Sequence, residues 1–198
     1  MAAQLIPPGA PEFRTRFTAF SYSVFRLETL QNYGNSGEDA AVAAFLADEP
    51  APHEPAIEEW DAMIRRNAQA GRIQQRVHVI TEPLTDYMRF ELNGYAQSVD
   101  AGEEVRIVRV AENEPWPSDV PKSDYFLFDS SELYWQHYDD AGEWLGTEPI
   151  TDPAAIVRAC RWRDAALYRA TPWWDYLRNH HPELVQRVVA LPRASGRR

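Results

Sequence analysis

The chain has 198 residues, of which 44% are hydrophobic and 25% are charged, a composition typical of a globular protein with one sizeable core. No apolar run approaches the roughly 18 residues needed to span a bilayer, and the N-terminus lacks the regions of a signal peptide. The single cysteine excludes an internal disulfide, and no Cys/His set has zinc-ligand spacing. We therefore expect a cytoplasmic protein without a metal or cofactor.

The formal net charge of -10 is unevenly distributed along the chain. Residues 1–152 carry 11 Lys and Arg against 27 Asp and Glu, whereas residues 153–198 carry 9 Arg against 3 acidic residues. An acidic body argues against a nucleic-acid-binding protein. The basic last segment either binds an acidic partner or lies against the acidic body of its own chain.

The first third of the chain predicts helices separated by proline-rich segments. Residues 1–12 are rich in proline and small residues, and we expect them to be disordered. Residues 13–30 space phenylalanines at helical intervals, and their last part fits a helix end or a short strand. A helix is predicted after Ser36, a candidate N-cap, and another within residues 50–72, with Gly71 at its C′ position.

The middle of the chain predicts a strand–helix–strand unit. Residues 73–80 are rich in β-branched side chains and indicate a strand. Residues 84–102 place apolar side chains at helical spacing, and residues 103–110 indicate another strand. This order and length predict one right-handed crossover that joins a parallel pair of strands.

The last third predicts a hairpin-rich segment and a long helix. Residues 124–150 indicate antiparallel strands with tight turns. Asp152 is the expected N-cap of the long helix, which Pro172 should kink or end. We predict a single α/β or α+β domain with a mixed sheet over residues 13–170, and a C-terminal helical arm and tail over residues 171–198.

Four segments are similar to a known family: "FRLETLQNY", "GRIQQRVHVITEPLTDYMRFELNGY", "AGEEVRIVRV" and "SDYFLFDSSELYWQHYDDAGEWLG". With these segments, the chain resembles the uncharacterised actinobacterial family DUF6879 over roughly residues 17–170. Such proteins are frequently encoded beside helix-turn-helix regulators of the XRE type. The resemblance implies a regulatory or toxin–antitoxin-like setting and supplies no reaction.

The order of elements also resembles half of a phospholipase D-like domain. In that superfamily a catalytic His-x-Lys motif lies on a strand at about this place. The corresponding segment here, "KSDYFLFDSS", has Ser123 or Asp124 where the nucleophilic histidine is expected, and no His-x-Lys. The resemblance therefore implies a non-catalytic relative.

A group of charged residues follows the strand predicted over residues 73–80. Ligands bind beyond the carboxyl ends of strands in open α/β sheets, so this group is a candidate cleft floor. The alternative is a helix start with a Thr81 or Thr85 cap and an ion pair between Asp86 and Arg89 at i, i+3. The candidate cleft residues are Glu82, Arg89 and Glu91, with Tyr87 beside them and His78 or Arg76 facing them.

Two further groups complete the candidate ligand-binding residues. Arg26 and Glu28 alternate with apolar residues, so a strand would send both to one face, as a ligand-binding pair or a buried ion pair. His78 is either a satisfied core residue or part of that site. His137 and Asp139 would share a strand face, but no elbow glycine pattern accompanies them.

The segment "PWWDYL" is the best candidate for contact with another protein, through Trp173, Trp174 and Leu177. No Walker A loop, GxGxxG, HExxH or EF-hand is present in the sequence. We therefore expect a non-catalytic regulatory module that binds a protein partner, such as a helix-turn-helix regulator, or a small ligand. The alternative is a small-molecule enzyme or toxin. Its charged cleft would comprise Arg26, Glu28, Glu82, Arg89 and Glu91.

Overall fold

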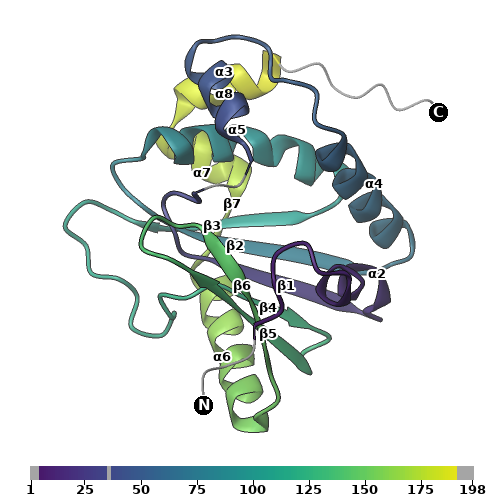
Figure 1. The fold of residues 1–198 in the computed structure, drawn as a ribbon. Coiled ribbons are helices and arrows are strands. Elements are labelled where there is room, and N and C mark those ends of the chain that lie inside the picture. The colour runs from purple at the N-terminus through teal and green to yellow at the C-terminus, as the bar shows by residue number, and fades with distance from the viewer. Residues whose placement is uncertain (1–4, 35–36, 191–198) are drawn as a thin grey trace.

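The computed structural model describes residues 5–34 and 37–190, and these form an α+β fold built on a seven-stranded mixed sheet (Figure 1). The strand order is β6-β5-β4-β1-β2-β3-β7. The central β1, β2 and β3 are parallel, and every other pairing is antiparallel. The strands are β1 Ser23–Glu28, β2 Ile73–Thr81, β3 Glu104–Val110, β4 Tyr125–Phe128, β5 Glu132–Tyr138, β6 Trp144–Ile150 and β7 Thr171–Pro172.

The helices cover the two faces of the sheet unequally (Figure 1). Helix α6 packs on one face, and α1, α2, α4, α5 and α7 pack on the other, with α3 and α8 lying against α5. The helices are α1 Pro11–Arg14, α2 Arg16–Ala19, α3 Asp39–Leu46, α4 Pro55–Gln69, α5 Asp86–Ala101, α6 Pro153–Arg169, α7 Trp173–His180 and α8 Pro182–Ala190.

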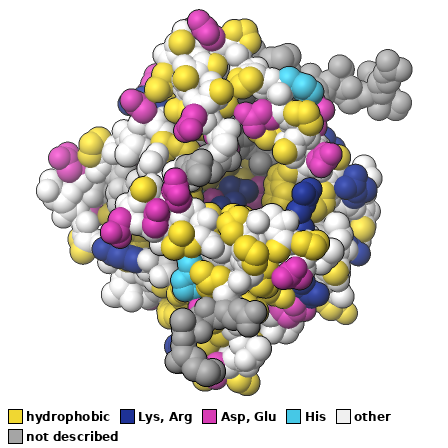
Figure 2. Space-filling model, viewed as in Figure 1, with side chains coloured by type: hydrophobic (Ala, Val, Ile, Leu, Met, Phe, Trp, Pro, Cys, Tyr) yellow, Lys and Arg dark blue, Asp and Glu magenta, His cyan; other side chains and the backbone are white. Residues whose placement is uncertain are grey.

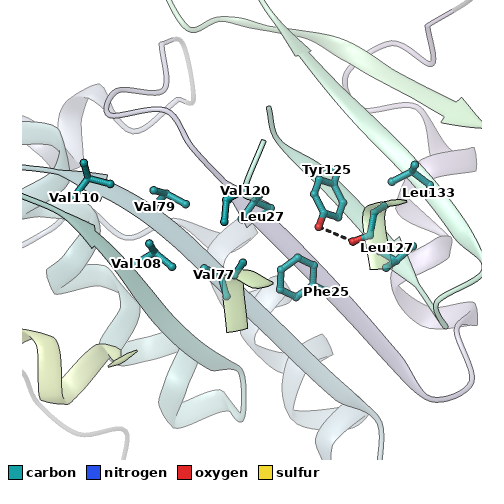
Figure 3. Close-up of a cluster of buried hydrophobic side chains, with 12 residues drawn as sticks. Phe25, Leu27, Val77, Val79, Val108, Val110, Val120, Tyr125, Leu127 and Leu133 are labelled. Carbon is teal, nitrogen blue, oxygen red and sulfur yellow. Dashed lines mark hydrogen bonds between the residues drawn. The ribbon is translucent and has the colours of Figure 1, made fainter. Parts of the chain in front are cut away.

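The sheet face that α6 covers contributes to a continuous apolar core, part of which Figure 3 shows. Alternate residues of the three parallel strands point into it, among them Leu27, Val77 and Val108, as the two-residue period of a strand requires. The hydroxyl of Tyr125 donates a hydrogen bond to the Ala159 carbonyl of α6 at 3.0 Å, so its polar end is satisfied inside this core.

The opposite face carries two apolar clusters rather than one. At one end, phenylalanines of α1, α2 and β4 pack together with Val24. At the other, α5, α7 and α8 pack on Ile80, Val105 and Ile107. The strand residues between the two clusters are polar or charged, and they include Arg26 and Arg76, which are register partners on β1 and β2.

The predicted boundaries that rest on capping residues agree with the structure. The Thr85 side chain accepts a hydrogen bond from the Met88 amide at the start of α5, and Gly102 ends that helix with φ 112°, a left-handed conformation that favours glycine. Asp152 caps α6 in the same way, and α6 ends before Pro172. The parallel pairing of β2 with β3, which α5 connects, confirms the predicted strand–helix–strand unit.

The N-terminal part differs from the prediction in detail. The helical part of residues 13–30 is divided into two short helices, and the last part of this segment forms the strand β1, which is one of the two alternatives that the sequence left open. Within the segment expected to be disordered, residues 5–12 make ordered contacts, since Ile6 and Thr147 exchange backbone hydrogen bonds at 2.8 and 2.9 Å. Residues 1–4 and the candidate cap Ser36 lie outside the described residues.

The C-terminal arm is integrated with the sheet rather than projecting from it. β7 pairs with β3, and the indole of Trp173 donates a hydrogen bond to the Leu92 carbonyl of α5 at 2.8 Å. Trp173 and Leu177 are buried in the cluster that contains α5. Residues 191–198 of the predicted tail lie outside the described residues.

Candidate functional site

A buried charged centre lies between the two apolar clusters, on the sheet face that α5 covers. β1 contributes Arg26 and Glu28, and β2 contributes Arg76 and His78. Alternation along each strand places both side chains of each pair on this face, and the parallel register sets Arg26 beside Arg76. The centre is completed by Glu91 and Tyr95 of α5 and by Glu103, next to the first residue of β3.

Arg76 holds the centre together because its guanidinium faces three carboxylates. It donates two hydrogen bonds to Glu103 at 3.1 and 3.3 Å and one to Glu28 at 2.9 Å. Its Nη1 also lies 3.7 Å from a Glu91 oxygen. The planar guanidinium lies over the Tyr95 ring, with Cζ 5.1 Å from the centroid. A fork of this kind suits the buried pairing of several carboxylates better than a lysine would.

Glu28 is ionised between two arginines. Burial alone would raise its pKa, but Arg26 and then Arg76 outweigh burial and lower the pKa of Glu28 to about 2. Its two oxygens lie 2.7 Å from Arg26 Nη2 and 2.9 Å from Arg76 Nη1. This carboxylate is therefore committed to structural pairing and is poorly suited to acid–base work near neutral pH.

His78 is a fully buried neutral imidazole whose tautomer follows from its partners. Nε2 lies 2.8 Å from the Leu30 carbonyl, which can only accept, so Nε2 carries the proton. Nδ1 then accepts from the Tyr95 hydroxyl at 2.6 Å. Burial lowers the pKa of His78, although Glu28 nearby opposes that shift. Both ring nitrogens are engaged, so His78 is a satisfied core residue, which is one of the two interpretations that the sequence left open.

Glu91 is the carboxyl group that the two arginines leave least compensated. Three carboxylates, those of Glu28, Glu91 and Glu103, face two guanidiniums, and among the described residues the only arginine contact of Glu91 is the 3.7 Å one. Burial, together with the negative charge of Glu28, raises the pKa of Glu91 to about 7. The centre can therefore take up or release a proton near neutral pH, or accept one further positive charge.

A second polar group adjoins the centre and was not among the residues that the sequence pointed to as a ligand site. Asp124, just before β4, accepts hydrogen bonds from the Thr29 amide and hydroxyl at 2.8 and 2.7 Å and from the Tyr33 hydroxyl at 2.6 Å. Burial raises the pKa of Asp124 to about 6, although the hydrogen bond from Tyr33 opposes this. Only the distant pairing of β1 with β4 brings these residues together.

The centre is not completely closed. The side chain of Arg26 retains 23% of its exposure and that of Glu91 retains 15%. Figure 2 shows a hollow in the face of the molecule below α5, with basic and acidic side chains deep inside it. Among the described residues, no acceptor is within hydrogen-bond distance of the buried Nε of Arg26. A small molecule can therefore reach the exposed parts of Arg26 and Glu91.

Three tyrosines border the partly exposed side of the centre. The ring of Tyr33 lies 6.0 Å from that of Tyr87 and 5.5 Å from that of Tyr138, centroid to centroid. Tyr87 precedes Glu91 by one helical turn, and Tyr138 lies near Arg26, whose positive charge opposes the rise that burial gives to the pKa of Tyr138. The Tyr87 hydroxyl donates to Glu38 at 3.2 Å. Aromatic rings and carboxyl groups therefore lie together beside the centre.

The structure divides the charged group that follows β2 into separate sites. Glu82 lies away from the centre, where it accepts hydrogen bonds from Arg109 at 2.7 Å and from Tyr176 at 3.0 Å. Arg89 contacts Glu183 of α8 at 3.4 Å on the surface. Of the predicted cleft floor, only Glu91 belongs to the buried centre. The five-residue cleft expected for an enzyme is therefore not assembled, since Glu82 and Arg89 are paired elsewhere.

Two other candidates have partners that the sequence did not indicate. His137 lies 2.8 Å from Glu148 of β6, not beside Asp139, because strand pairing brings those residues together. Of the proposed partner-binding residues, Trp173 and Leu177 are buried, and only Trp174 is partly exposed. Contact with another protein through this segment stays a prediction, with Trp174 as its accessible part.

The described part of the chain contains neither a metal-binding cluster nor a membrane span. Within residues 5–34 and 37–190, no group of three or more His, Cys, Asp or Glu side chains is arranged to hold a metal ion. Over the same residues, no helix is both long and apolar enough to cross a membrane.

Comparison with known proteins gives one family. The model of the family described as "Domain of unknown function (DUF6879)" matches residues 11–178, which include the sheet, the charged centre and most of helix α7. No curated protein matches the chain. The match covers most of the 198 residues, and the chain therefore belongs to the DUF6879 family.

Proposed function

We propose that this protein is a non-catalytic regulatory module that binds a small polar ligand at its charged centre. The observation that supports this proposal is that most groups of the buried centre are paired, whereas two of them lack a full set of partners. Glu28, Arg76 and His78 are saturated by neighbours, whereas the Nε of Arg26 lacks an acceptor among the described residues and Glu91 lacks a close cation there. The side chains of Arg26 and Glu91 keep partial exposure, 23% and 15%, although the Nε atom itself is buried.

The pairing pattern supports binding over catalysis. A catalytic base or nucleophile must be free to reach the substrate, and it is usually oriented by one partner rather than consumed by several. Here Glu28 pairs with both arginines, Arg76 pairs with both Glu28 and Glu103, and the histidine of the centre has both nitrogens engaged. Glu91 alone has a pKa near neutrality without a strong hydrogen bond. An enzyme or toxin that works through this centre is the alternative.

The regulatory part of the proposal rests on the family resemblance, which implies helix-turn-helix regulators as protein partners. The partly exposed Trp174 is the accessible candidate for such a contact. A cytoplasmic location belongs to the same proposal and is supported by the single cysteine, Cys160, whose thiol is free.

The test is the capture of a metabolite. Purified protein is incubated with a small-molecule cell extract, freed from unbound compounds by gel filtration and denatured, and the released compounds are identified by mass spectrometry. The variant Arg26→Met removes the incompletely paired guanidinium of the centre. Arg163→Met is the matched control, because Arg163 lies on α6, has a similar exposure of 21% and pairs with Asp164.

We expect at least one compound that is retained by the wild type and by the control variant and is lost from Arg26→Met. Recovery of that compound unchanged supports a binding module. Its conversion into a product by the wild type would move the function to an enzyme. The absence of any compound that depends on Arg26 would overturn the proposal, provided that all three proteins show the same cooperative unfolding transition.

A further inference from the structure

We propose that the ligand carries an ammonium group, which binds at Glu91 beside the ring of Tyr87, a ring that groups with those of Tyr33 and Tyr138. This inference rests on the proposed function, because it names the chemical class that the charged centre accepts.

The charge of the centre favours a cationic ligand. Glu28, Glu91 and Glu103 supply three acidic groups within contact distance of Arg26 or Arg76. The two arginines neutralise two of these groups, and the hydrogen bonds assign their charge to Glu28 and Glu103. Glu91 is the remaining acid. A cation that binds at Glu91 compensates the negative charge of its carboxylate, which a bound proton would otherwise neutralise.

The aromatic rings favour an ammonium group independently of the charge count. Tyr33 lies between Tyr87 and Tyr138, with centroid separations of 6.0 and 5.5 Å. The electron-rich faces of such rings attract an ammonium group within about 6 Å of a centroid. The hydroxyls of Tyr33 and Tyr87 already donate to Asp124 and Glu38, so the rings are held in place before a ligand arrives.

The site is also accessible, and Arg26 adds a positive charge to it. Glu91 and Arg26 retain partial exposure, and the hollow in Figure 2 contains both acidic and basic side chains. The exposed part of the Arg26 side chain can pair with a ligand oxygen in the same site. An organic cation that also bears an oxygen acceptor would pair with both Glu91 and Arg26. The charged or titratable groups around Glu91 are Arg26, Glu28, Glu38, Arg76, Tyr87 and Tyr95.

The test uses three probes with the same carbon skeleton: propylammonium, 1-propanol and propionate. Binding of each to the whole protein is measured by saturation-transfer NMR titration. We expect propylammonium to bind the most tightly of the three. Glu91→Gln keeps the shape of the side chain and should weaken propylammonium at least about tenfold while leaving 1-propanol unchanged. Glu148→Gln, a partly exposed glutamate paired with His137 on β5, is the control and should change nothing.

The dependence on pH gives a second readout that does not need a variant. Propylammonium competes with the proton on Glu91, whose pKa is raised to about 7 by burial and by Glu28. Binding should therefore tighten about thirtyfold between pH 5.5 and pH 8.5 and change little above that. Tyr33→Leu removes the central ring and should weaken propylammonium at every pH without removing this dependence.

The outcomes separate the two proposals. Propionate binding that is lost in Arg26→Met, with no preference for propylammonium, would overturn the ammonium class and leave the ligand-binding module standing. Equal weak binding of all three probes, or propylammonium binding that Glu91→Gln does not change, would also overturn it. Metabolite capture with Arg26→Met tests the module itself, because it makes no assumption about the charge of the ligand.

Discussion

Replacing Arg76 with methionine should destabilise the protein far more than the same change at a surface arginine. Methionine keeps an unbranched chain of similar length but removes three hydrogen bonds to Glu28 and Glu103 and the 3.7 Å contact with Glu91. Three carboxyl groups then face Arg26 alone. Breaking a buried pair by removing one partner typically costs about 3–5 kcal/mol, which is a large part of the roughly 5–15 kcal/mol that holds a typical domain folded.

The assay is equilibrium unfolding in urea at pH 8, followed by tryptophan fluorescence. Arg169→Met is the control, because Arg169 pairs with Asp119 on the surface, where such a pair contributes about 0–1 kcal/mol. The loss in Arg76→Met should shrink as the pH falls from 8 to 5, because protonation of the remaining carboxylates relieves their repulsion. A loss below about 1 kcal/mol at pH 8, equal to that of the control, would refute a charged centre held together by Arg76.

Three further substitutions test separate parts of the structure. Glu91→Gln should match the wild type in stability at pH 5 and exceed it by about 1–3 kcal/mol at pH 8. Burial raises the pKa of Glu91 to about 7 in the native state, so the native protein keeps a proton on Glu91 between pH 4.5 and 7 that the unfolded chain has lost. The wild type therefore loses stability as this proton leaves with rising pH, and the glutamine variant does not. An identical difference at both pH values would contradict this reasoning. Thr85→Ala should cost about 1 kcal/mol in urea unfolding, because it removes the cap on the Met88 amide, and no loss would mean that the cap contributes nothing. Tyr176→Phe removes the hydrogen bond to Glu82 and should speed amide hydrogen exchange in α7. A hydrogen bond to a charged group typically contributes about 1.5–3 kcal/mol of stability, which sets the size of the effect. Unchanged exchange would show that this contact does not anchor the C-terminal arm.

Local signals in the sequence predicted the elements of the fold well. A threonine cap and a left-handed glycine bound α5, and an aspartate cap begins α6, because these positions depend only on neighbouring backbone groups. The strand β2 and its parallel partner β3 followed from β-branched runs on either side of a helix. The spacing of Phe13, Phe17 and Phe20 indicated a helix but not its division into two short helices, because that spacing reflects packing on β4 as well as helix formation.

The candidate site was predicted only in part, for reasons of geometry. Arg26 and Glu28 share a strand face, as their alternation indicated, and so do Arg76 and His78. Arg89 and Glu91 are two residues apart on a helix, where a rotation of about 200° sends them to different sides, so they could not line one cleft. Glu82 was placed with them because it is near in sequence, although it faces Arg109 on β3.

The residues that complete the centre carry no local signal. Glu103 lies beside Arg76 only because of the register between β2 and β3, and Asp124 reaches Thr29 only because β4 pairs with β1. Registers between strands far apart in the chain are set by the packing of the whole sheet, which a single sequence does not express. Glu103, Tyr33 and Tyr95 stand in the sequence as ordinary polar residues of a helix end, a loop and a helix.

The charged centre is tested most directly by the titration of Glu91, followed by carbon NMR of the protein labelled with ¹³C in its glutamate carboxyl groups. The Glu91→Gln variant assigns the signal by removing it. We predict a midpoint near pH 7, because burial and Glu28 raise the pKa of Glu91 to about 7, and a lower midpoint when propylammonium is added. A midpoint near the ordinary glutamate value of about 4.5, unchanged by propylammonium, would contradict a centre that holds one acid in excess.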